Sequence, residues 1–304
     1  MIAGASGVVG RHLVAAVQDR YDITVLTRTV DGDEPKGARA VAWNPRAAFE
    51  QDEAALEALS DELEGAFALI NLAGASIADG RLDADHKARV LNSRVDSTNT
   101  LVAAFEGAVQ RPTAWFQASA TGYYGDRGNE ELTEASSSQD DFFLAKVTRH
   151  WEKATDPVRD LTRLIIGRFG LVLAKDAEAW QKMVAPVKLF VGGPLGSGQQ
   201  WYAWIDADDL ARGILFLLED SSARGVYNFT APEPVRQIDL FKKAGDKLKR
   251  PVFMPAPALA LRLALGGVAD ALLLPSAKVL PERLLSEGFT FEQADIDTEL
   301  EKIL

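Results

Sequence analysis

The sequence contains no cysteine and only three histidines, at positions 12, 86 and 150. Without cysteine the chain can form no disulfide, thiolate nucleophile or Cys-ligated zinc site. The three histidines, His12, His86 and His150, are too dispersed along the chain to suggest a metal cage. We therefore expect no metal centre.

Positive charge is also scarce, with 33 Lys and Arg against 44 Asp and Glu in 304 residues, a formal net charge of −11. An acidic chain repels phosphate backbones at long range, and no stripe of Lys and Arg offsets this locally. Nucleic acid is therefore not an expected partner.

Long apolar runs are missing. The longest, residues 257–275, is interrupted by Arg262, Gly266, Gly267 and Asp270, whereas a membrane-spanning helix needs about 20 mostly apolar residues. Its leucines predict helix buried in the core of a smaller lobe. No basic segment followed by an apolar one opens the sequence, so we expect a cytoplasmic protein with no membrane partner.

Short apolar runs alternate with segments of helical period through the first 170 residues, which is typical of an α/β protein with a doubly wound parallel sheet of Rossmann type. Strands are expected at 23–27, 39–43, 67–72, 115–119 and 163–168, and helices at 9–17, 53–63, 84–105 and 143–154. Only three residues precede the first glycine, so the first strand is either clipped or unusually short.

Beyond residue 170 the alternation loosens. A helix is expected near 179–190, another from Asp208, a strand at 225–230 and a helical tail. We assign 1–170 to a dinucleotide-binding domain to which 203–230 returns, and 171–202 with 231–304 to a smaller substrate lobe. The glycine-rich segment 192–198 predicts either a lid over the substrate or a structural crossover.

Glycines recur every three residues at Gly4, Gly7 and Gly10, directly after an apolar segment and directly before a helical one. In that context the first glycine permits a tight turn, the second lets the backbone approach a pyrophosphate, and the third lets helix pack on strand. The helix N-terminus supplies free N–H groups and the positive end of a dipole. The segment therefore predicts a dinucleotide site.

The residue that distinguishes NAD from NADP is expected at the end of the second strand. Arg28 stands there, and the next acidic residue is Asp31. A guanidinium can bind a 2′-phosphate with two N–H donors and stack on adenine. We therefore predict NADP as the cofactor, the alternative being that Arg28 is an ordinary exposed cation.

Further motifs lie along the chain. Two of them follow the fourth and fifth predicted strands, namely Asn71-Leu72-Ala73-Gly74 and Ser119-Ala120-Thr121-Gly122-Tyr123-Tyr124-Gly125. Three come later, namely Gly192-Gly193-Pro194-Leu195-Gly196, Trp204-Ile205 before Asp208-Asp209-Leu210, and Leu280-Pro281 before Arg283-Leu284. Together with the glycine loop they resemble the extended, atypical short-chain dehydrogenase/reductases, and more closely the "epimerase family protein" branch, which carries a C-terminal domain of unknown function.

The resemblance implies cofactor contacts by the loop residues Gly4, Ser6, Gly7, Val8, Val9 and Gly10, by Arg28, and by Leu72, Ala73 and Gly74. Asn71 is instead interpreted as a buried residue that holds strand geometry. Ser119 or Thr121 would hydrogen-bond a substrate carbonyl or alcohol. Asp206 or Asp208 is interpreted as the cap of a helix.

The chain departs from the family pattern at the catalytic helix. Short-chain dehydrogenases use Tyr-x-x-x-Lys, in which the phenol exchanges the proton that accompanies hydride transfer. Counting back four residues from Lys146 gives Phe142, which transfers no proton. Lys146 is either a ligand of the nicotinamide ribose or an exposed lysine, and Tyr123 or Tyr124 is a candidate replacement for the phenol.

The sequence thus predicts an NADP-binding oxidoreductase or epimerase acting on a small carbonyl or sugar-like substrate. The alternative is an NADP-binding regulator or redox sensor that has lost turnover, which the phenylalanine at 142 favours. The sequence identifies neither the substrate nor the oligomeric state, and a homo-oligomer is compatible with it.

Overall fold

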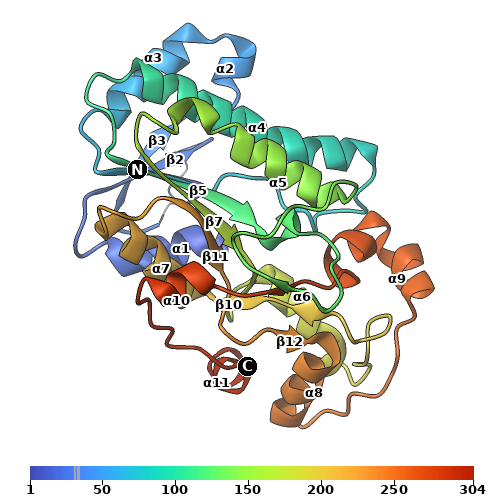
Figure 1. The fold of residues 1–304 in the computed structure, drawn as a ribbon. Helices are drawn as coiled ribbons and strands as arrows, with labels where there is room; N and C mark the ends of the chain where they lie inside the picture. Colours follow the sequence, from blue (N-terminus) through green and yellow to red (C-terminus); the bar gives the residue numbers. More distant parts are fainter. Residues whose placement is uncertain (31, 33–34) are drawn as a thin grey trace.

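The computed structural model describes residues 1–30, 32 and 35–304, so Asp31 lies outside the described part. A parallel sheet of seven strands, in the order β11-β7-β5-β4-β1-β2-β3, forms the centre of the described molecule (Figure 1). Its strands are β1 (Ile2–Ala3), β2 (Ile23–Thr27), β3 (Ala38–Ala42), β4 (Ala68–Asn71), β5 (Ala114–Ala120), β7 (Arg163–Phe169) and β11 (Gly225–Phe229). The strand order reverses at β1, where parallel sheets open a crevice for ligands. The predicted Rossmann-type fold is confirmed.

Helices cover both faces of the sheet because successive strand residues point to opposite sides. Val25 and Phe116 pack with α1 and α7, while their neighbours Leu26 and Trp115 pack with α3 and α4. The helices of this part are α1 (Val8–Val17), α2 (Ala47–Glu50), α3 (Glu53–Leu63), α4 (Ala84–Gly107), α5 (Phe143–Lys153) and α7 (Ala207–Glu219), with 3-10 turns η1 (Thr121–Tyr123) and η2 (Asp156–Val158).

The first strand is short yet central. Ile2 pairs with Val25 of β2 on one side and with Ile70 of β4 on the other. The amino group of Met1 donates a hydrogen bond of 2.8 Å to the carbonyl of Ala68, and burial lowers the pKa of that amino group to about 6. Two residues of strand therefore carry the glycine loop that follows them.

Most of the remaining chain builds small sheets and helices beyond the carboxyl edge of the main sheet, while residues 282–286 lie beside the edge strand β11 (Figure 1). The paired strands are β8 (Leu171–Leu173) with β10 (Trp204–Asp206), β9 (Trp201–Tyr202) with β12 (Val235–Arg236), and β6 (Glu131–Leu132) with β13 (Lys278–Val279). The helices are α6 (Glu178–Lys188), α8 (Gln237–Leu248), α9 (Ala258–Leu265), the π-helical η3 (Ala269–Leu273), α10 (Glu282–Ser286) and α11 (Ile296–Ile303). Segment 203–230 contributes β11 to the main sheet.

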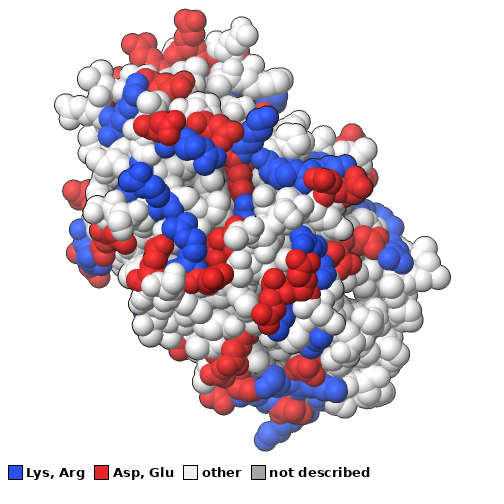
Figure 2. All heavy atoms as spheres, in the orientation of Figure 1, with Lys and Arg blue, Asp and Glu red and all other residues white. Residues whose placement is uncertain are grey.

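The prediction that the leucine-rich tail is buried is wrong for α9. All of α9 lies in the described part and none of its residues is buried, with Leu259 68% and Leu263 70% exposed. The surface beside α8 and α9, at the lower right of Figure 2, is accordingly poor in charge. The leucines recur every second residue, so they point to opposite sides of the helix, and one docking face cannot cover them all.

The glycine-rich segment 192–198 is a structural crossover. Its backbone bridges Gly192 to Val252 and Leu195 to Ala256, and Gly196 donates a hydrogen bond of 2.9 Å to Ala256. A Cβ on Gly193 would lie 1.9 Å from the carbonyl oxygen of Met254. These contacts favour the crossover over the lid.

No helix among the described residues is long and apolar enough to cross a membrane. In the same part of the chain, no three His, Asp or Glu side chains gather in a group that could hold a metal ion.

Candidate functional site

A cleft of about 1150 Å³ opens at the carboxyl ends of β1, β2 and β4. Its floor is the glycine loop, and its walls are the segments that follow β2, β3 and β4 together with one side of α4. The lining residues include Gly4, Ser6, Arg28, Ala73 and Gly74, all expected from the sequence, and Asn44, Arg46, Ser93 and Asp96, which were not.

The three glycines of the loop have different surroundings. Gly4 has φ +84°, and a Cβ there would lie 2.7 Å from the backbone of Leu72. A Cβ on Gly10 would lie 2.5 Å from the Cα of Ala5, so helix α1 packs directly on the loop. At Gly7 a Cβ would meet only the carbonyl of Gly4, at 3.5 Å. The space beside Gly7 is therefore open to a bound group.

Helix α1 presents its N-terminus to this space. Gly7 is the N-cap residue and has no side chain to accept from the first turn. The first helical backbone bond joins Arg11 to Gly7, which leaves the N–H groups of Val8, Val9 and Gly10 outside the helical ladder. A pyrophosphate fits this set of donors and the positive end of the helix dipole.

Two arginines stand at the far end of the cleft. Arg28 is exposed where β2 ends, and Arg46 follows β3. The guanidinium of Arg46 lies 3.3 Å from a carboxylate oxygen of Asp96 on α4 and over the ring of Phe49. These contacts hold Arg46 at the wall of the cleft.

The segment after β4 also reaches the cleft. Asn71 is fully buried and bonded to Thr98, Gln117 and the N–H of Ala73, which supports its interpretation as a structural residue. Gly74 packs against Arg94 of α4, whose guanidinium donates to the carbonyl of Ala75. Burial lowers the pKa of Arg94 to about 10.

Ser119 and Tyr124 belong to a buried polar network beyond β5. Ser119, 2% exposed, donates a hydrogen bond of 2.6 Å to Glu152 of α5. The carboxylate of Glu152 also pairs with Arg168 of β7, which is in register with Ser119 on the neighbouring strand. Arg168 donates to the phenol of Tyr124, and Tyr124 donates to Asn228. Burial raises the pKa of Tyr124 to about 12.

Tyr123 and Thr121 lie closer to the surface than this network. Both are partly exposed in the turn η1, which follows β5 at the carboxyl edge of the sheet. The guanidinium of Arg168 stacks on the ring of Tyr123, 3.3 Å from its centroid. Of the hydroxyl groups expected after β5, these two are therefore the ones that a substrate could reach.

Lys146 of α5 is exposed, whereas Leu144 and Thr148 are buried. A Cβ on Gly122 would approach the side chain of Leu144 to 2.9 Å, so Leu144 is a residue of α5 beside the turn η1. Phe142 precedes the helix as its N-cap residue. Residues two apart on a helix point to opposite sides, so Lys146 points away from the side of Leu144.

Of the two aspartates considered as caps, Asp206 accepts hydrogen bonds from the N–H groups of Asp208 and Asp209 at the start of α7, as predicted. Arg46, Glu152 and Arg168 were missed. No motif of the sequence marks them, and only the register of β5 with β7 or the approach of α4 shows their neighbours.

Comparison with known families gives two matches. The NAD dependent epimerase/dehydratase family matches residues 1–229, and the domain of unknown function DUF1731 matches residues 256–303. An epimerase family protein of Staphylococcus epidermidis is 36% identical over 310 residues, which covers 100% of this chain and 98% of that protein.

Solved structures of similar proteins agree with the match to the epimerase/dehydratase family. The human epimerase family protein SDR39U1 (isoform 2) with NADPH has a TM-score of 0.87 at 28% identity, covering 99% of this chain and 97% of that one. A nucleoside-diphosphate sugar epimerase of Corynebacterium glutamicum has a TM-score of 0.75 at 32% identity, covering 99% of this chain and 57% of that one. This chain therefore belongs to the NAD-dependent epimerase/dehydratase family and carries the DUF1731 domain at its C-terminal end.

Proposed function

We propose that the protein binds NADP(H) in the cleft above β1 and acts as an oxidoreductase or epimerase on a small carbonyl or sugar-like substrate. The observation that carries the cofactor assignment is the pair of arginines, Arg28 and Arg46, in the wall of the cleft where β2 and β3 end. Two guanidinium groups suit a ribose 2′-phosphate, which NAD lacks. The structure of SDR39U1 with NADPH supports the same choice.

The nicotinamide group would supply the hydride, and the chain would supply binding and proton transfer. Val8, Val9 and Gly10 would hold the pyrophosphate through their N–H groups, beside Gly4, Ser6 and Gly7. Leu72, Ala73 and Gly74 would line the path from the adenosine to the sheet edge. These assignments rest on the open space at Gly7 and on the residues that line the cleft.

For the substrate we propose Thr121 and Tyr123 as the hydroxyl groups that contact a carbonyl or alcohol oxygen. Ser119 and Tyr124 are bonded within the buried network and would act as positioning residues. Lys146 is left out of the proposed site because it projects from the opposite side of α5.

The cofactor assignment is tested by calorimetric titration of NADPH and NADH into the wild-type protein and the variants R28A and R46A. Loss of a charge-assisted hydrogen bond is worth about 1.5–3 kcal/mol, so each variant should bind NADPH about 10- to 100-fold more weakly and NADH unchanged. R39A is the matched control, since Arg39 pairs with Glu62 outside the cleft. Equal affinity of the wild type for both nucleotides would reject the NADP assignment.

One observation favours a second function, a cofactor-binding regulator without turnover. Phe142 stands four residues before Lys146 and α5 contains no tyrosine, so the phenol and ammonium pair is absent from this helix. A screen of carbonyl substrates for NADPH oxidation, run with wild type and Y123F, separates the two. Turnover that Y123F abolishes supports the enzyme, whereas binding without turnover across the screen supports the regulator.

A further inference from the structure

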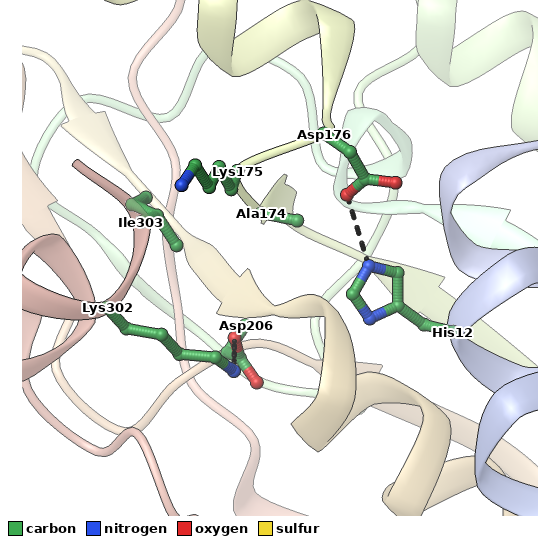
Figure 3. A pocket seen from close by; sticks show the side chains of 7 residues that line it. All are labelled: His12, Ala174, Lys175, Asp176, Asp206, Lys302 and Ile303. Carbon is green, nitrogen blue, oxygen red and sulfur yellow. Dashed lines mark hydrogen bonds and ion pairs between the residues drawn. The ribbon is translucent and has the colours of Figure 1, made fainter.

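A chain of ion pairs joins the C-terminal helix α11 to the start of α1. The ammonium of Lys302 lies 2.6 Å from a carboxylate oxygen of Asp206 at the N-terminus of α7 (Figure 3). It also lies 2.7 Å from a carboxylate oxygen of Asp208 in the first turn of that helix. The other oxygen of Asp208 lies 2.5 Å from Nδ1 of His12 on α1. Helix α11 is thereby connected to the helix whose N-terminus faces the cofactor cleft.

From α1 the chain continues to the glycine loop. Nε2 of His12 lies 3.2 Å from Asp176, in the segment between β8 and α6. Asp176 accepts a hydrogen bond of 2.6 Å from Arg11, and the same guanidinium donates, at 2.6 Å, to the carbonyl of Ser6. Ser6 lines the cofactor cleft, so four side chains separate Lys302 from a residue of the proposed pyrophosphate site.

Apolar packing and ion pairs both lie between α11 and α1. Ile296, Leu300 and Ile303 of α11 are buried in a hydrophobic cluster against which Val8 of α1 also packs. Beside this cluster is a cavity of about 370 Å³ whose lining includes His12, Asp176, Asp206 and Lys302, so the ion pairs form the polar part of the connection (Figure 3). Burial lowers the pKa values of Lys302 and His12, but their carboxylate partners outweigh it and raise both. The charged forms are thus favoured.

We infer that Lys302 is a positioning residue through which the C-terminal domain holds the pyrophosphate-binding loop in shape. The inference rests on the proposed cofactor function of that loop. It assigns a role in cofactor affinity to the last helix of the DUF1731 domain.

The test uses the variants K302M, K302R and K247M. Lys247 of α8 pairs with Glu301 of α11, so K247M removes an ion pair from the same helix without touching the chain to α1. We expect K302M to weaken NADPH binding about 5-fold or more, K302R to restore most of the affinity, and K247M to leave it unchanged. D176N breaks the chain at its far end and should weaken binding in the same way without disturbing the packing of α11.

Hydrogen exchange in the protein without nucleotide gives a second measurement that does not depend on binding. Backbone amides of residues 6–12 should exchange faster in K302M and D176N than in the wild type and K247M. Failure of the wild type to bind either nucleotide would refute the proposed function, while faster exchange would still support the coupling. Unchanged exchange and affinity in K302M, or equal losses in K302M and K247M, would overturn the inference.

Discussion

Glu299 of α11 makes the stability of the fold depend on pH. Its side chain is fully buried, and neither carboxylate oxygen has a hydrogen-bond partner among the described residues. Burial, and then the nearby charge of Asp206, raise the pKa of Glu299 from 4.5 to about 8, with Asp209 adding to the effect and Lys302 opposing it. The group is therefore neutral in the folded protein at pH 7 and ionised in the unfolded chain.

The sign and size of the effect follow from proton linkage. Between pH 4.5 and 8 the folded state binds one proton more than the unfolded state at this site, so stability falls as pH rises. At about 1.4 kcal/mol per pKa unit the loss has a ceiling of about 5 kcal/mol at pH 8. Rearrangement around the charged carboxylate reduces that ceiling, and we expect a loss of about 2 kcal/mol.

The substitution E299Q removes the titration while keeping the shape and hydrogen-bonding capacity of the neutral acid. Urea unfolding of wild type and E299Q at pH 5, 7 and 9 should give curves whose difference grows with pH, from near zero at pH 5 to about 2 kcal/mol in favour of E299Q at pH 9. E301Q is the matched control, because Glu301 is an exposed carboxylate of the same helix. A difference between E299Q and wild type that is constant across this range would refute the reasoning.

Two further predictions concern the glycine loop and the buried network. A Cβ on Gly10 would clash with the backbone of Ala5, whereas one on Gly7 would fill open space. Thermal unfolding should therefore show that G10A is destabilised by about 1–3 kcal/mol and that G7A is as stable as the wild type. Titration should show that G7A has nevertheless lost NADPH binding. E152Q would leave the guanidinium of Arg168 buried without its carboxylate, which costs about 3–5 kcal/mol in urea unfolding, against less than about 1 kcal/mol for E62Q in the exposed pair with Arg39. Stable E152Q, or G7A that binds NADPH normally, would contradict these two arguments.

The sequence predicts the Rossmann part well because its signals are local. Strands covered on both faces are nearly continuous apolar runs, and the expected strand at 23–27 and helix at 53–63 coincide with β2 and α3. The glycine spacing likewise places Gly4 in the lining of the cleft, Gly7 at the N-cap of α1 and Gly10 against Ala5, because the turn between β1 and α1 is set within seven residues.

The parts that the sequence does not predict depend on contacts between distant segments. Helix α9 is exposed although it is rich in leucine, since burial is decided by what packs against a helix and not by its composition. The choice of Phe142 and Lys146 relied on spacing alone, and spacing does not show that Lys146 is exposed while Leu144 and Thr148 are buried. The contact of Arg46 with Asp96 of α4 likewise joins segments that are distant in the sequence.

The buried ion pair of Glu152 and Arg168 bears on how a phenol could work here without the usual lysine. An ion pair inside a protein is often no more stabilising than apolar residues of the same size, so its presence is not explained by stability alone. This pair fixes Arg168 between two tyrosines, bonded to the phenol of Tyr124 and stacked on the ring of Tyr123. The guanidinium thus orients the one partly exposed phenol of η1 while keeping a permanent positive charge against its ring. In the proposed enzyme, the cation that accompanies the phenol would come from β7 instead of from α5.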